Sequence, residues 1–508
     1  MFAKITGVGL FGLNAYPLEI EADVSGGLPQ FDIVGLPDAA VKESRDRVRA
    51  AIKNSGFNFP LSRLTVNLAP ADQKKEGSAA DLPILLAILL ASDQLKAVPN
   101  DAVFLGELSL DGTLRPVNGI LAMTIAARQQ GFRQIFVPKE NAAEAAVIED
   151  ITVYGVESVR ALLDHLTEKE PILPQPTTPF RPDTGEALPD FADVKGQVAA
   201  KRALEIAAAG GHNILLIGPP GSGKSMLAKR FSSILPQITF EESVETTKIH
   251  SIAGILNQDA PILTARPFRA PHHTVSAAGL GGGGTMPKPG EISLAHNGVL
   301  FLDELPELRR DAMEILRQPL EDGKITVSRV SGSATYPCDF TLIAAMNPCP
   351  CGFFGHPTRA CICSTNAVHK YLNRISGPLL DRLDLHVEVP PVDYQALSDS
   401  VPAESSAQIR ERVNRAREIQ HRRFAGTDVS CNARMTPAML RKYCVLTEDA
   451  AAYLRGSFDK LGLSARAYDR ILKISRTIAD LEGTEKIEKS QIFSAICFRS
   501  LDRKYWNV

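Results

Sequence analysis

The chain of 508 residues is too long for a single hydrophobic core, so we expect two to four domains. An apolar content of 44% and a charged content of 22% are ordinary for globular protein. The net charge of −2 gives no global signal for nucleic acid, so any basic surface that binds it must be local.

The first residues, MFAKITGVGLFGLNAYPLEI, are broken by glycines and lack a clean cleavage site for export. The longest apolar run, LPILLAILLAS, lies between Asp81 and Asp93 and is too short to span a bilayer, so it predicts a buried helix. We therefore expect a soluble cytoplasmic protein with no membrane partner. Its cysteines are then expected to be thiols or metal ligands rather than structural disulfides.

Three units and a linker follow along the chain. Residues 1–168 alternate strands such as RLTVNLAP and RQIFVPK with helical stretches, which predicts an α/β domain. Residues 169–189 include PILPQPTTPFRP, whose prolines favour an extended, semi-rigid linker. A second α/β pattern occupies 190–395, and 396–508 is helical in pattern. The basic run within the tail, Arg410 to Arg423, is interpreted as a solvated face of an amphipathic helix.

The strongest motif is NILLIGPPGSGKSMLAKRF, an apolar strand that enters a glycine-rich loop followed by a helix. The predicted phosphate-binding loop consists of Gly218, Pro219, Pro220, Gly221, Ser222, Gly223, Lys224 and Ser225. Backbone N–H groups and the helix N-terminus bind phosphates in such loops. Lys224 is expected to reach the β- and γ-phosphates and Ser225 to hold Mg²⁺. A chance glycine turn is a weak alternative, because every motif position is filled.

Two further apolar strands end in polar residues. GVLFLDEL ends in Asp303, which suits Mg²⁺, and Glu304, which can polarise an attacking water. FTLIAAMNP ends in Asn347, whose amide can contact the γ-phosphate or orient that water. The alternative for the acidic pair, a strand-end turn, is disfavoured by the phosphate loop in the same domain.

One proline separates Asn347 from CPCGFFGHPTRACIC, which places Cys349, Cys351, Cys361 and Cys363 within fifteen residues. Two C-x-C pairs can supply four thiolates to one Zn²⁺, with His356 as a possible extra ligand. A reduced, cysteine-rich turn is the main alternative, and a redox switch is a third. A zinc ion here would hold a loop that otherwise lacks a core.

Two arginines are candidates for contacts to the nucleotide. Arg382, in SGPLLDRLDL, can act as an arginine finger on a neighbouring subunit or can simply pair with Asp381 or Asp384 at a helix end. Arg466, in LSARAYDR, begins a helix of the tail and is a candidate sensor of the γ-phosphate.

These motifs, together with PFRAPHHTVSAAGLGGGG, resemble the ComM/YifB family of magnesium-chelatase-like AAA+ ATPases over nearly the whole chain. The resemblance implies a homo-hexameric ring that hydrolyses ATP with Mg²⁺, a P-loop core and a C-terminal helical lid. It also implies Asp303 and Glu304 as Walker B, Asn347 as sensor 1, Arg382 as finger and Arg466 as sensor 2. The family includes DNA branch-migration motors, whereas magnesium chelatase subunits remodel a metal-insertion complex. The ATPase core therefore indicates a motor but does not show which molecule, DNA or protein, the motor acts on.

The N-terminal unit resembles the Lon protease domain, of the ribosomal S5 domain 2-like class, through KKEGSAADLPILLAIL and FLGELSLDGTLRPVNGILAM. That family uses a Ser-Lys dyad. Here Ala79 stands in the serine's place and Leu121 in the lysine's, while Ser78 is one residue early. A serine without a base is a poor nucleophile, so we expect the fold without peptidase chemistry.

Two segments bear on which molecule the ATPase acts on. FRAPHHTVSAAGLGGGGTMPKPGEI lies between the phosphate loop and Walker B, and GKITVSRVSGSATYPCDF predicts a hairpin that turns at residues 331–333. Such loops can face the pore of a ring, where Lys288, Lys324 and Arg329 would meet phosphates. Solvated hairpin charges are the alternative. His272 and His273 are expected to pack or to bond within their loop rather than to bind metal.

The favoured function is ATP-driven remodelling of single-stranded or branched DNA, by branch migration or helicase-like translocation in recombination of imported DNA. A protein-remodelling ATPase of the magnesium-chelatase kind is the alternative, and an ATP-dependent protease is argued against by the missing dyad.

Overall fold

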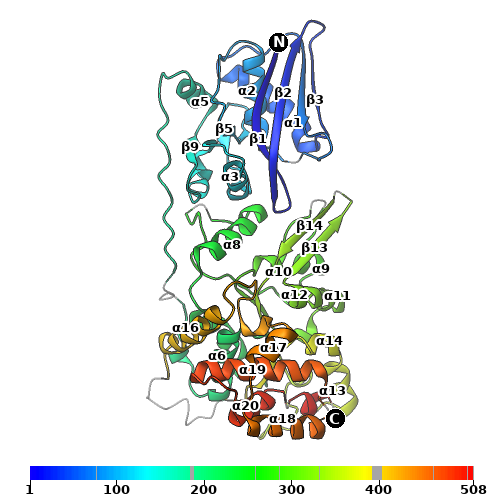
Figure 1. Ribbon diagram of the computed structural model, residues 1–508. Coiled ribbons are helices and arrows are strands. Elements are labelled where there is room, and N and C mark those ends of the chain that lie inside the picture. The colour runs from blue at the N-terminus through cyan, green and yellow to red at the C-terminus, as the bar shows by residue number, and fades with distance from the viewer. Residues whose placement is uncertain are drawn as a thin grey trace.

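The computed structural model describes residues 1–506 apart from 76, 184–187, 258, 285–286, 331, 392–402, 462 and 500. The molecule is elongated, with an N-terminal α/β domain at one end and the remaining α/β and helical parts at the other (Figure 1). The predicted boundary at residue 395 lies outside the described residues. No helix in the described part of the chain is long and apolar enough to cross a membrane.

The N-terminal domain begins with a four-stranded sheet in the order β1-β2-β4-β3. Its strands are β1 (Phe2–Phe11), β2 (Asn14–Ser25), β3 (Gln30–Val34) and β4 (Arg63–Ala69), and helices α1 (Ala39–Asn54) and α2 (Asp81–Ala91) accompany them. Every residue of α2 except Leu90 is buried, which confirms the buried helix predicted from the apolar run. Asp81 is buried with it and binds Arg47 Nε at 2.6 Å.

A second, parallel sheet completes this domain in the order β5-β8-β9. Its strands are β5 (Ala102–Phe104), β8 (Gln134–Pro138) and β9 (Thr152–Val156). The chain also forms the short pair of β6 (Glu107–Leu108) and β7 (Leu114–Arg115). Helices α3 (Ile120–Gln129), α4 (Ala142–Ala145) and α5 (Val159–Leu166) alternate with them. The α/β pattern expected for this region is confirmed.

The proline-rich segment is extended over residues 171–183, as its composition predicts, and runs down one side of the molecule (Figure 1). It is also docked. The amides of Gln175 and Thr178 donate to Val153 O at 2.8 Å and Ala146 O at 2.9 Å. The ring of Phe180 then lies 5.6 Å from that of Phe240 in the following domain. The segment therefore contacts both units that it joins.

A five-stranded parallel sheet forms the centre of the second unit, in the order β11-β12-β15-β10-β16. In chain order its strands are β10 (Ile214–Ile217), β11 (Phe268–Arg269), β12 (Val299–Leu302), β15 (Thr341–Met346) and β16 (Leu385–Glu388). The residues of β10, β12 and β15 are all buried, which explains their uninterrupted apolar sequences. Helices α6 (Val198–Gly210) and α7 (Lys224–Arg230) flank β10 in sequence.

The segments that interrupt this sheet form α8 (Phe240–Ala253), α9 (Ala277–Gly281), α10 (Glu291–Leu294), α11 (Arg310–Ile315), α12 (Arg317–Asp322) and the hairpin of β13 (Lys324–Arg329) and β14 (Gly332–Pro337). The predicted hairpin is confirmed. Its turn is expected at residues 331–333, of which residue 331 lies outside the described residues. Gly332 and Ser333 are paired with Arg329 and Ser328, so they belong to β14 rather than to the turn.

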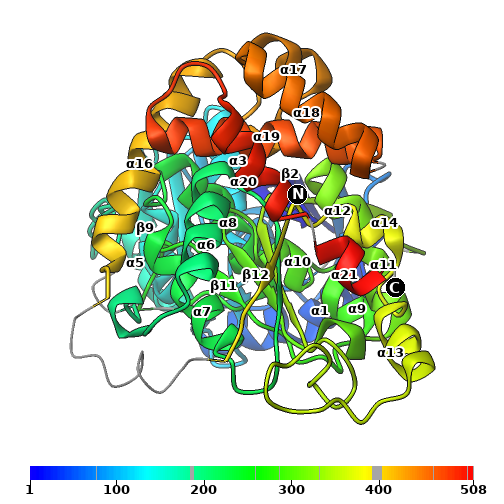
Figure 2. The ribbon, with the colours of Figure 1, turned by 90° about the horizontal axis from the view of Figure 1, so that it is seen from below.

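The last part of the chain is helical, as predicted. After α13 (Thr365–Leu372) and α14 (Gly377–Leu380) come α16 (Ser406–Arg423), α17 (Pro437–Tyr443), α18 (Glu448–Leu461), α19 (Ala465–Glu482), α20 (Lys489–Cys497) and α21 (Leu501–Trp506). Helices α17, α18 and α19 lie together along one side of the unit (Figure 2).

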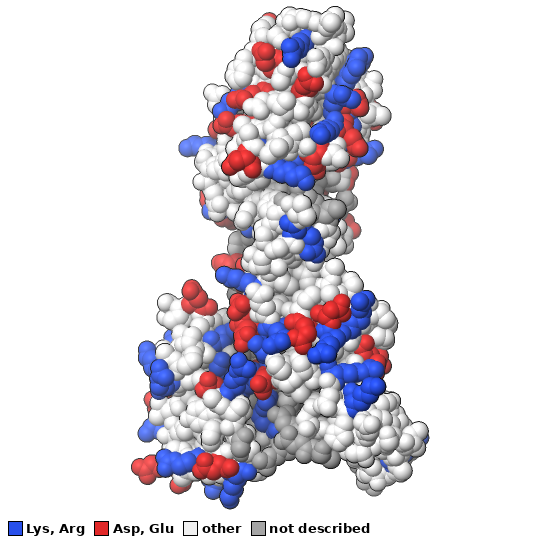
Figure 3. Space-filling model, turned by 90° about the vertical axis from the view of Figure 1, so that its right-hand side faces the viewer, with Lys and Arg blue, Asp and Glu red and all other residues white. Residues whose placement is uncertain are grey.

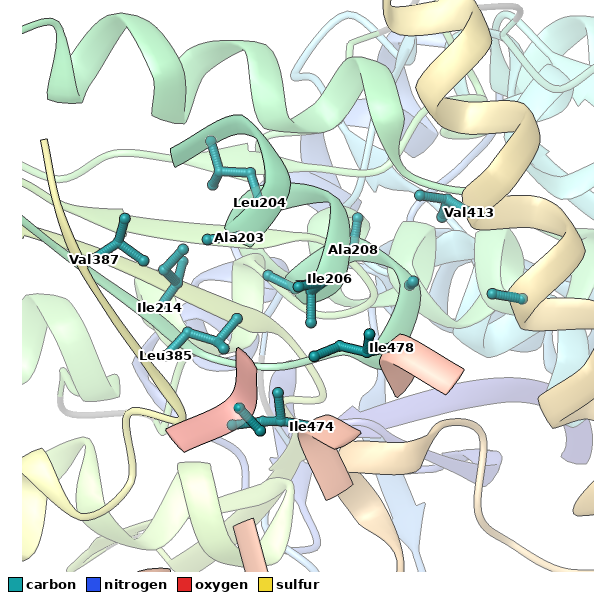
Figure 4. Close-up of a cluster of buried hydrophobic side chains, with 14 of the residues drawn as sticks. Ala203, Leu204, Ile206, Ala208, Ile214, Leu385, Val387, Val413, Ile474 and Ile478 are labelled. Atoms are coloured by element: carbon teal, nitrogen blue, oxygen red, sulfur yellow. The ribbon is translucent and has the colours of Figure 1, made fainter. Parts of the chain in front are cut away.

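These helices share one hydrophobic core with the sheet. Ile474 and Ile478 of α19 and Val413 of α16 pack with Ile206 of α6 and Leu385 of β16 (Figure 4). The tail therefore covers apolar surface of the sheet domain, and its burial contributes to the stability of both.

The interpretation of the basic run on α16 as a solvated face is wrong for three of its arginines. Arg412 Nε donates to Glu205, Arg417 Nε donates to Ala208 O at 3.1 Å, and Arg423 Nη1 donates to Asp480 Oδ2 at 2.7 Å. A sequence pattern shows that a charged side chain lies on one helix face but not which carboxylate or carbonyl from a distant element that face meets.

The two ends of the molecule meet at α8 and the hairpin. Gly119 N donates to Ser251 Oγ at 3.0 Å, and Ser251 Oγ donates to the buried Glu144. A Cβ on Gly12, in the turn between β1 and β2, would lie 2.6 Å from Cβ of Ala334 on β14. The contact therefore requires glycine at this turn.

We expect Glu144→Gln to stabilise the protein increasingly as the pH rises. Burial raises the pKa of Glu144 above its ordinary value, and the hydrogen bonds from Ser251 and Leu121 only partly oppose it. A raised carboxyl pKa means that the stability present at low pH is lost as the group ionises, and glutamine avoids that loss.

Differential scanning calorimetry between about pH 5 and pH 8 measures this effect, with the exposed Glu149→Gln as control. A melting-temperature difference between Glu144→Gln and the parent that does not grow with pH would contradict the prediction.

Candidate nucleotide site

The glycine-rich loop connects β10 to α7, as its sequence predicts. Gly221 and Gly223 have φ of 76° and 91°, a region that favours glycine. At Gly218 a Cβ would come within 2.2 Å of Val389 O, because the loop begins against the end of β16. The glycines are therefore required by backbone geometry and close packing.

A cavity of about 390 Å³ opens beside this loop. It is lined by Pro220, Gly221, Ser222, Gly223, Lys224, Ser225, Met226, Asp303, Glu304, Met346 and Asn347. It lies at the carboxyl ends of β10, β12 and β15, where parallel sheets bind ligands. The structure thus brings together the loop and the three strand-end residues that the sequence singles out.

Lys224 is buried within this cavity, and its ammonium donates to three neutral oxygens. Its Nζ lies 2.8 Å from Gly218 O, 2.9 Å from Pro219 O and 3.2 Å from Asn347 Oδ1. Desolvation lowers the pKa of Lys224, while Asp303 and Glu304 favour the charged form. Because all three of these acceptors are neutral, the charge of the ammonium is not compensated by a direct bond to a carboxylate. It is therefore suited to bind an anionic phosphate.

Ser225 and Asp303 lie together on the other side of the loop. Ser225 Oγ donates to Asp303 Oδ2 at 2.6 Å, and Asp303 Oδ1 accepts from Glu304 N at 2.9 Å. A hydroxyl and a carboxylate oxygen at this spacing are the hard ligands that Mg²⁺ prefers, so the residues fit the predicted ion. Glu304 itself has φ of 50°, which is unusual for a non-glycine residue and typical of functional sites.

His273 is a site residue that the sequence analysis missed. Its Nδ1 lies 3.1 Å from Glu304 Oε2, and its ring lies 4.1 Å from that of His272. The sequence predicts that both histidines pack or bond within their loop. His272 does so through Nδ1, which lies 2.9 Å from Thr274 Oγ1, and the two rings pack together, but the contact of His273 with Glu304 is not predicted. Only the paired histidines of PFRAPHH marked this segment in the sequence.

Arg382 and Arg466 do not line the cavity of their own chain, as far as the described residues show. Arg382 follows α14, where its guanidinium donates to Glu321 and, at 2.6 Å, to Pro378 O. Arg466 is 62% exposed at the start of α19 and lies 3.8 Å from Asp381. Both arginines therefore occupy one region beside α14, and their action on a nucleotide stays a prediction.

The predicted DNA contacts lie on the hairpin and the loop beside it. Lys288 and Lys324 are exposed. Arg329 is exposed as well, but its guanidinium donates to Gly284 O at 3.1 Å, Ser328 O at 2.7 Å and Gly282 O at 3.4 Å. These acceptors are neutral, so the bonds position the charge without neutralising it. On the face in Figure 3, basic and acidic side chains are interspersed.

The four cysteines lie together directly after Asn347. Their Sγ atoms all fall within 4.8 Å of one another, and all are free thiols.

In the N-terminal domain, Leu121 is buried among apolar side chains, and the Ser78 hydroxyl donates to Glu107. The hydroxyl of Ser78 therefore pairs with a carboxylate and not with the lysine of a Ser-Lys dyad.

Comparison with known proteins decides the family. A family model described as magnesium chelatase, subunit ChlI, matches residues 190–397, a second ChlI model matches 20–141, and one for the ChlI C-terminal part matches 403–499. The chain is 46% identical over 499 residues to YifB of Salmonella typhimurium and 45% identical over 500 residues to the competence protein ComM of Haemophilus influenzae. Each alignment covers 97% of this chain and 96% of the relative.

The chain belongs to the ComM/YifB family of magnesium-chelatase-like AAA+ ATPases. A more distant relative, the magnesium-chelatase 67 kDa subunit of Chlorobaculum parvum, is 30% identical over 164 residues, which is 31% of this chain and 23% of that protein. Membership in the ComM/YifB family implies ATP and Mg²⁺ as ligands and a class of protein that is typically oligomeric.

We expect His273→Ala to slow ATP hydrolysis while leaving nucleotide affinity nearly unchanged, because the imidazole holds Glu304 rather than the phosphate loop. A net hydrogen-bond contribution of about 0.5–1.5 kcal/mol corresponds to about two- to twelvefold in rate. Steady-state phosphate release and a fluorescent-nucleotide titration measure the two quantities. His272→Ala is the matched control, and Glu304→Gln gives the lower limit. Equal rates for His273→Ala and the parent would show that the contact does not position Glu304.

Proposed function

We propose that the chain is an ATP-driven motor that remodels single-stranded or branched DNA, by branch migration or helicase-like translocation in recombination of imported DNA. The observation that carries the ATPase part is the cavity that gathers Lys224, Ser225, Asp303, Glu304 and Asn347. The DNA part rests on the full-length similarity to the competence protein ComM. We place this activity in the cytoplasm.

In this proposal each side chain acts where it lies. Lys224 binds the β- and γ-phosphates of ATP, and Ser225 and Asp303 would hold Mg²⁺, which supplies positive charge to those phosphates when bound. Glu304 polarises the attacking water, and Asn347, whose Oδ1 is 3.2 Å from Lys224 Nζ, orients the water or contacts the γ-phosphate.

A homo-hexameric ring would complete the site. Arg382 and Arg466 lie beside α14 rather than in the cavity of their own chain. Arg382 is therefore proposed to act as a finger on the nucleotide of the neighbouring subunit, where an arginine stabilises charge in the transition state. Arg466 is proposed as sensor 2, which senses the γ-phosphate from the helical lid. The Nε of Arg382 is buried and has no hydrogen-bond partner among the described residues, so the pairing with Glu321 leaves one donor of this guanidinium unsatisfied.

We expect Arg382→Ala protein to bind ATP but to hydrolyse it about 10³-fold more slowly or worse. Mixed with Lys224→Ala protein, which cannot bind ATP, it should regain activity, because some interfaces then combine an intact loop with an intact arginine. Phosphate release at increasing mixing ratios measures the rescue. Absence of rescue in rings shown to contain both proteins would argue against action across the interface.

The hairpin is proposed as the grip on DNA. It directly precedes β15, the strand that ends at Asn347, so a change at the nucleotide is transmitted along one strand to the hairpin. Because the protein has a net charge of −2, binding must rest on local phosphate contacts from Lys288, Lys324 and Arg329.

Changing both Lys324 and Arg329 to alanine should leave basal ATPase activity largely intact while reducing DNA stimulation and junction movement. The salt dependence of DNA binding should weaken by about 0.9 in log–log slope for each DNA phosphate that the variant no longer neutralises. Branch migration of a synthetic Holliday junction and filter binding at several salt concentrations measure these effects.

Two controls separate charge from structure. Arg329→Lys keeps the charge but loses the fork that binds three backbone carbonyls, and Lys96→Ala removes an exposed charge from the N-terminal domain. If the double variant moves junctions as well as the parent does, the hairpin is not the grip. If the parent shows neither DNA stimulation nor junction movement, a protein-remodelling ATPase becomes the better description.

That second function is favoured by the family models, whose descriptions name magnesium chelatase subunits. For the N-terminal domain we propose a Lon-like fold without Ser-Lys peptidase chemistry, supported by the buried, apolar Leu121 in the place of the lysine. The C-terminal helices are proposed to serve as a lid.

A further inference from the structure

We propose that Cys349, Cys351, Cys361 and Cys363 form a tetrathiolate Zn²⁺ site that braces the phosphate loop. These residues belong to the cysteine loop, residues 348–363, which connects the strand-end Asn347 to α13. This metal takes no part in the chemistry of ATP hydrolysis.

The spacing of the sulfur atoms supports a single metal ion. Cys349 Sγ lies 3.4 Å from Cys351 Sγ and 3.6 Å from Cys361 Sγ, and the last two are 3.6 Å apart. Four thiolates at about 2.3 Å from one Zn²⁺ in a tetrahedron are about 3.8 Å apart. A disulfide needs about 2.0 Å between its sulfurs. In an iron–sulfur cluster the thiolates bind different irons and lie farther apart, so one tetrahedral ion is the best fit.

The surroundings of the sulfurs are also those of a metal site. The amide of Phe354 donates to Cys349 Sγ at 3.3 Å, and such donors stabilise and orient thiolate ligands. Gly352, with φ of 83°, turns the chain back, and its amide donates to Cys349 O at 2.9 Å. This tight turn is what brings Cys349 and Cys351 to the same point.

The sequence makes His356 a possible extra ligand, but in the structure its imidazole bonds and packs within the loop. Its Nδ1 accepts from Arg359 N at 3.0 Å and from Thr358 N at 3.2 Å. Its ring packs on Phe353 with the centroids 5.6 Å apart. Four cysteines therefore complete the coordination, and His356 shapes the loop between the two pairs.

Few residues of the cysteine loop are fully buried. Among its described residues these are Pro348, Cys349 and Gly352, while residues 357–360 are exposed. A segment with so little core needs another constraint to hold one conformation. A zinc ion supplies it, because binding of the metal is coupled to folding of the loop that carries the ligands.

The loop lies against the nucleotide site. A Cβ on Gly352 would come within 2.4 Å of Pro220 Cδ, so the backbone of the cysteine loop and the phosphate loop are in direct contact. On its other side, Phe354 packs near Tyr505 of α21, with ring centroids 6.3 Å apart. A metal that fixes the position of Gly352 therefore limits how far Pro220 can move.

The test begins with the full-length protein purified without chelator. We expect about one zinc per chain by elemental analysis, and release of that zinc to a colorimetric indicator as a mercurial modifies the thiols. Replacement by Co²⁺ should give the visible absorption of a tetrahedral cobalt thiolate. Less than stoichiometric zinc together with no such absorption would overturn the site, and so would iron in its place.

Cys351→Ser/Cys361→Ser protein should lose the zinc, whereas Cys497→Ser, at an exposed cysteine of α20, should keep it. If the double variant fails to fold, the mercurial titration of the parent still decides the matter. Zinc-depleted parent protein should bind a fluorescent ATP analogue several-fold more weakly than zinc-replete protein. Equal affinity would overturn the bracing role, and unchanged zinc in the double variant would overturn the ligand assignment. Metal content is measured independently of hydrolysis and of DNA.

Discussion

The hydrogen-bonded register of β10 between β15 and β16 is the constraint on which the nucleotide site depends. Ile217 is paired with Met346 on one side and with Glu388 on the other, so Gly218 and Asn347 leave the sheet at the same level. A slip of one residue would turn each strand's side chains to the opposite face and separate Lys224 from its partner amide. The backbone ladder, rather than any contact between charged groups, therefore defines the geometry of the site.

The same arrangement explains the electrostatics. Burial disfavours the ammonium of Lys224, and two nearby carboxylates favour it. Within the described part of the chain this charge forms no salt bridge that a phosphate would have to break. Asp303 accepts hydrogen bonds from Ser225 Oγ and from the backbone amide of Glu304. The opposing charges are held a short distance apart and ready for an anion and a cation together.

Much of this could be predicted from sequence, because the phosphate loop, Asp303 and Asn347 all follow buried strands, and parallel strands end at a common edge. The buried helix α2 and the hairpin were likewise local patterns. What could not be predicted depends on residues that meet only after folding. No local rule places His273 beside Glu304, docks the proline-rich segment on Val153 and Ala146, or directs Arg412 to Glu205. The proposed contact of Arg382 with a neighbouring nucleotide would likewise depend on a second chain, which no local pattern describes.

The shared core of the sheet and the tail has a consequence for biosynthesis. His212, at the end of α6, is buried against Thr477, 265 residues later, and α19 covers apolar side chains that precede β10. A ribosome must therefore complete almost the whole chain before this surface can be covered. The N-terminal domain, whose sheets close within the first 160 or so residues, has no such delay. A nascent chain would thus carry one finished domain and one unfinished, exposed core for most of its synthesis, and the second would depend on chaperones during that interval.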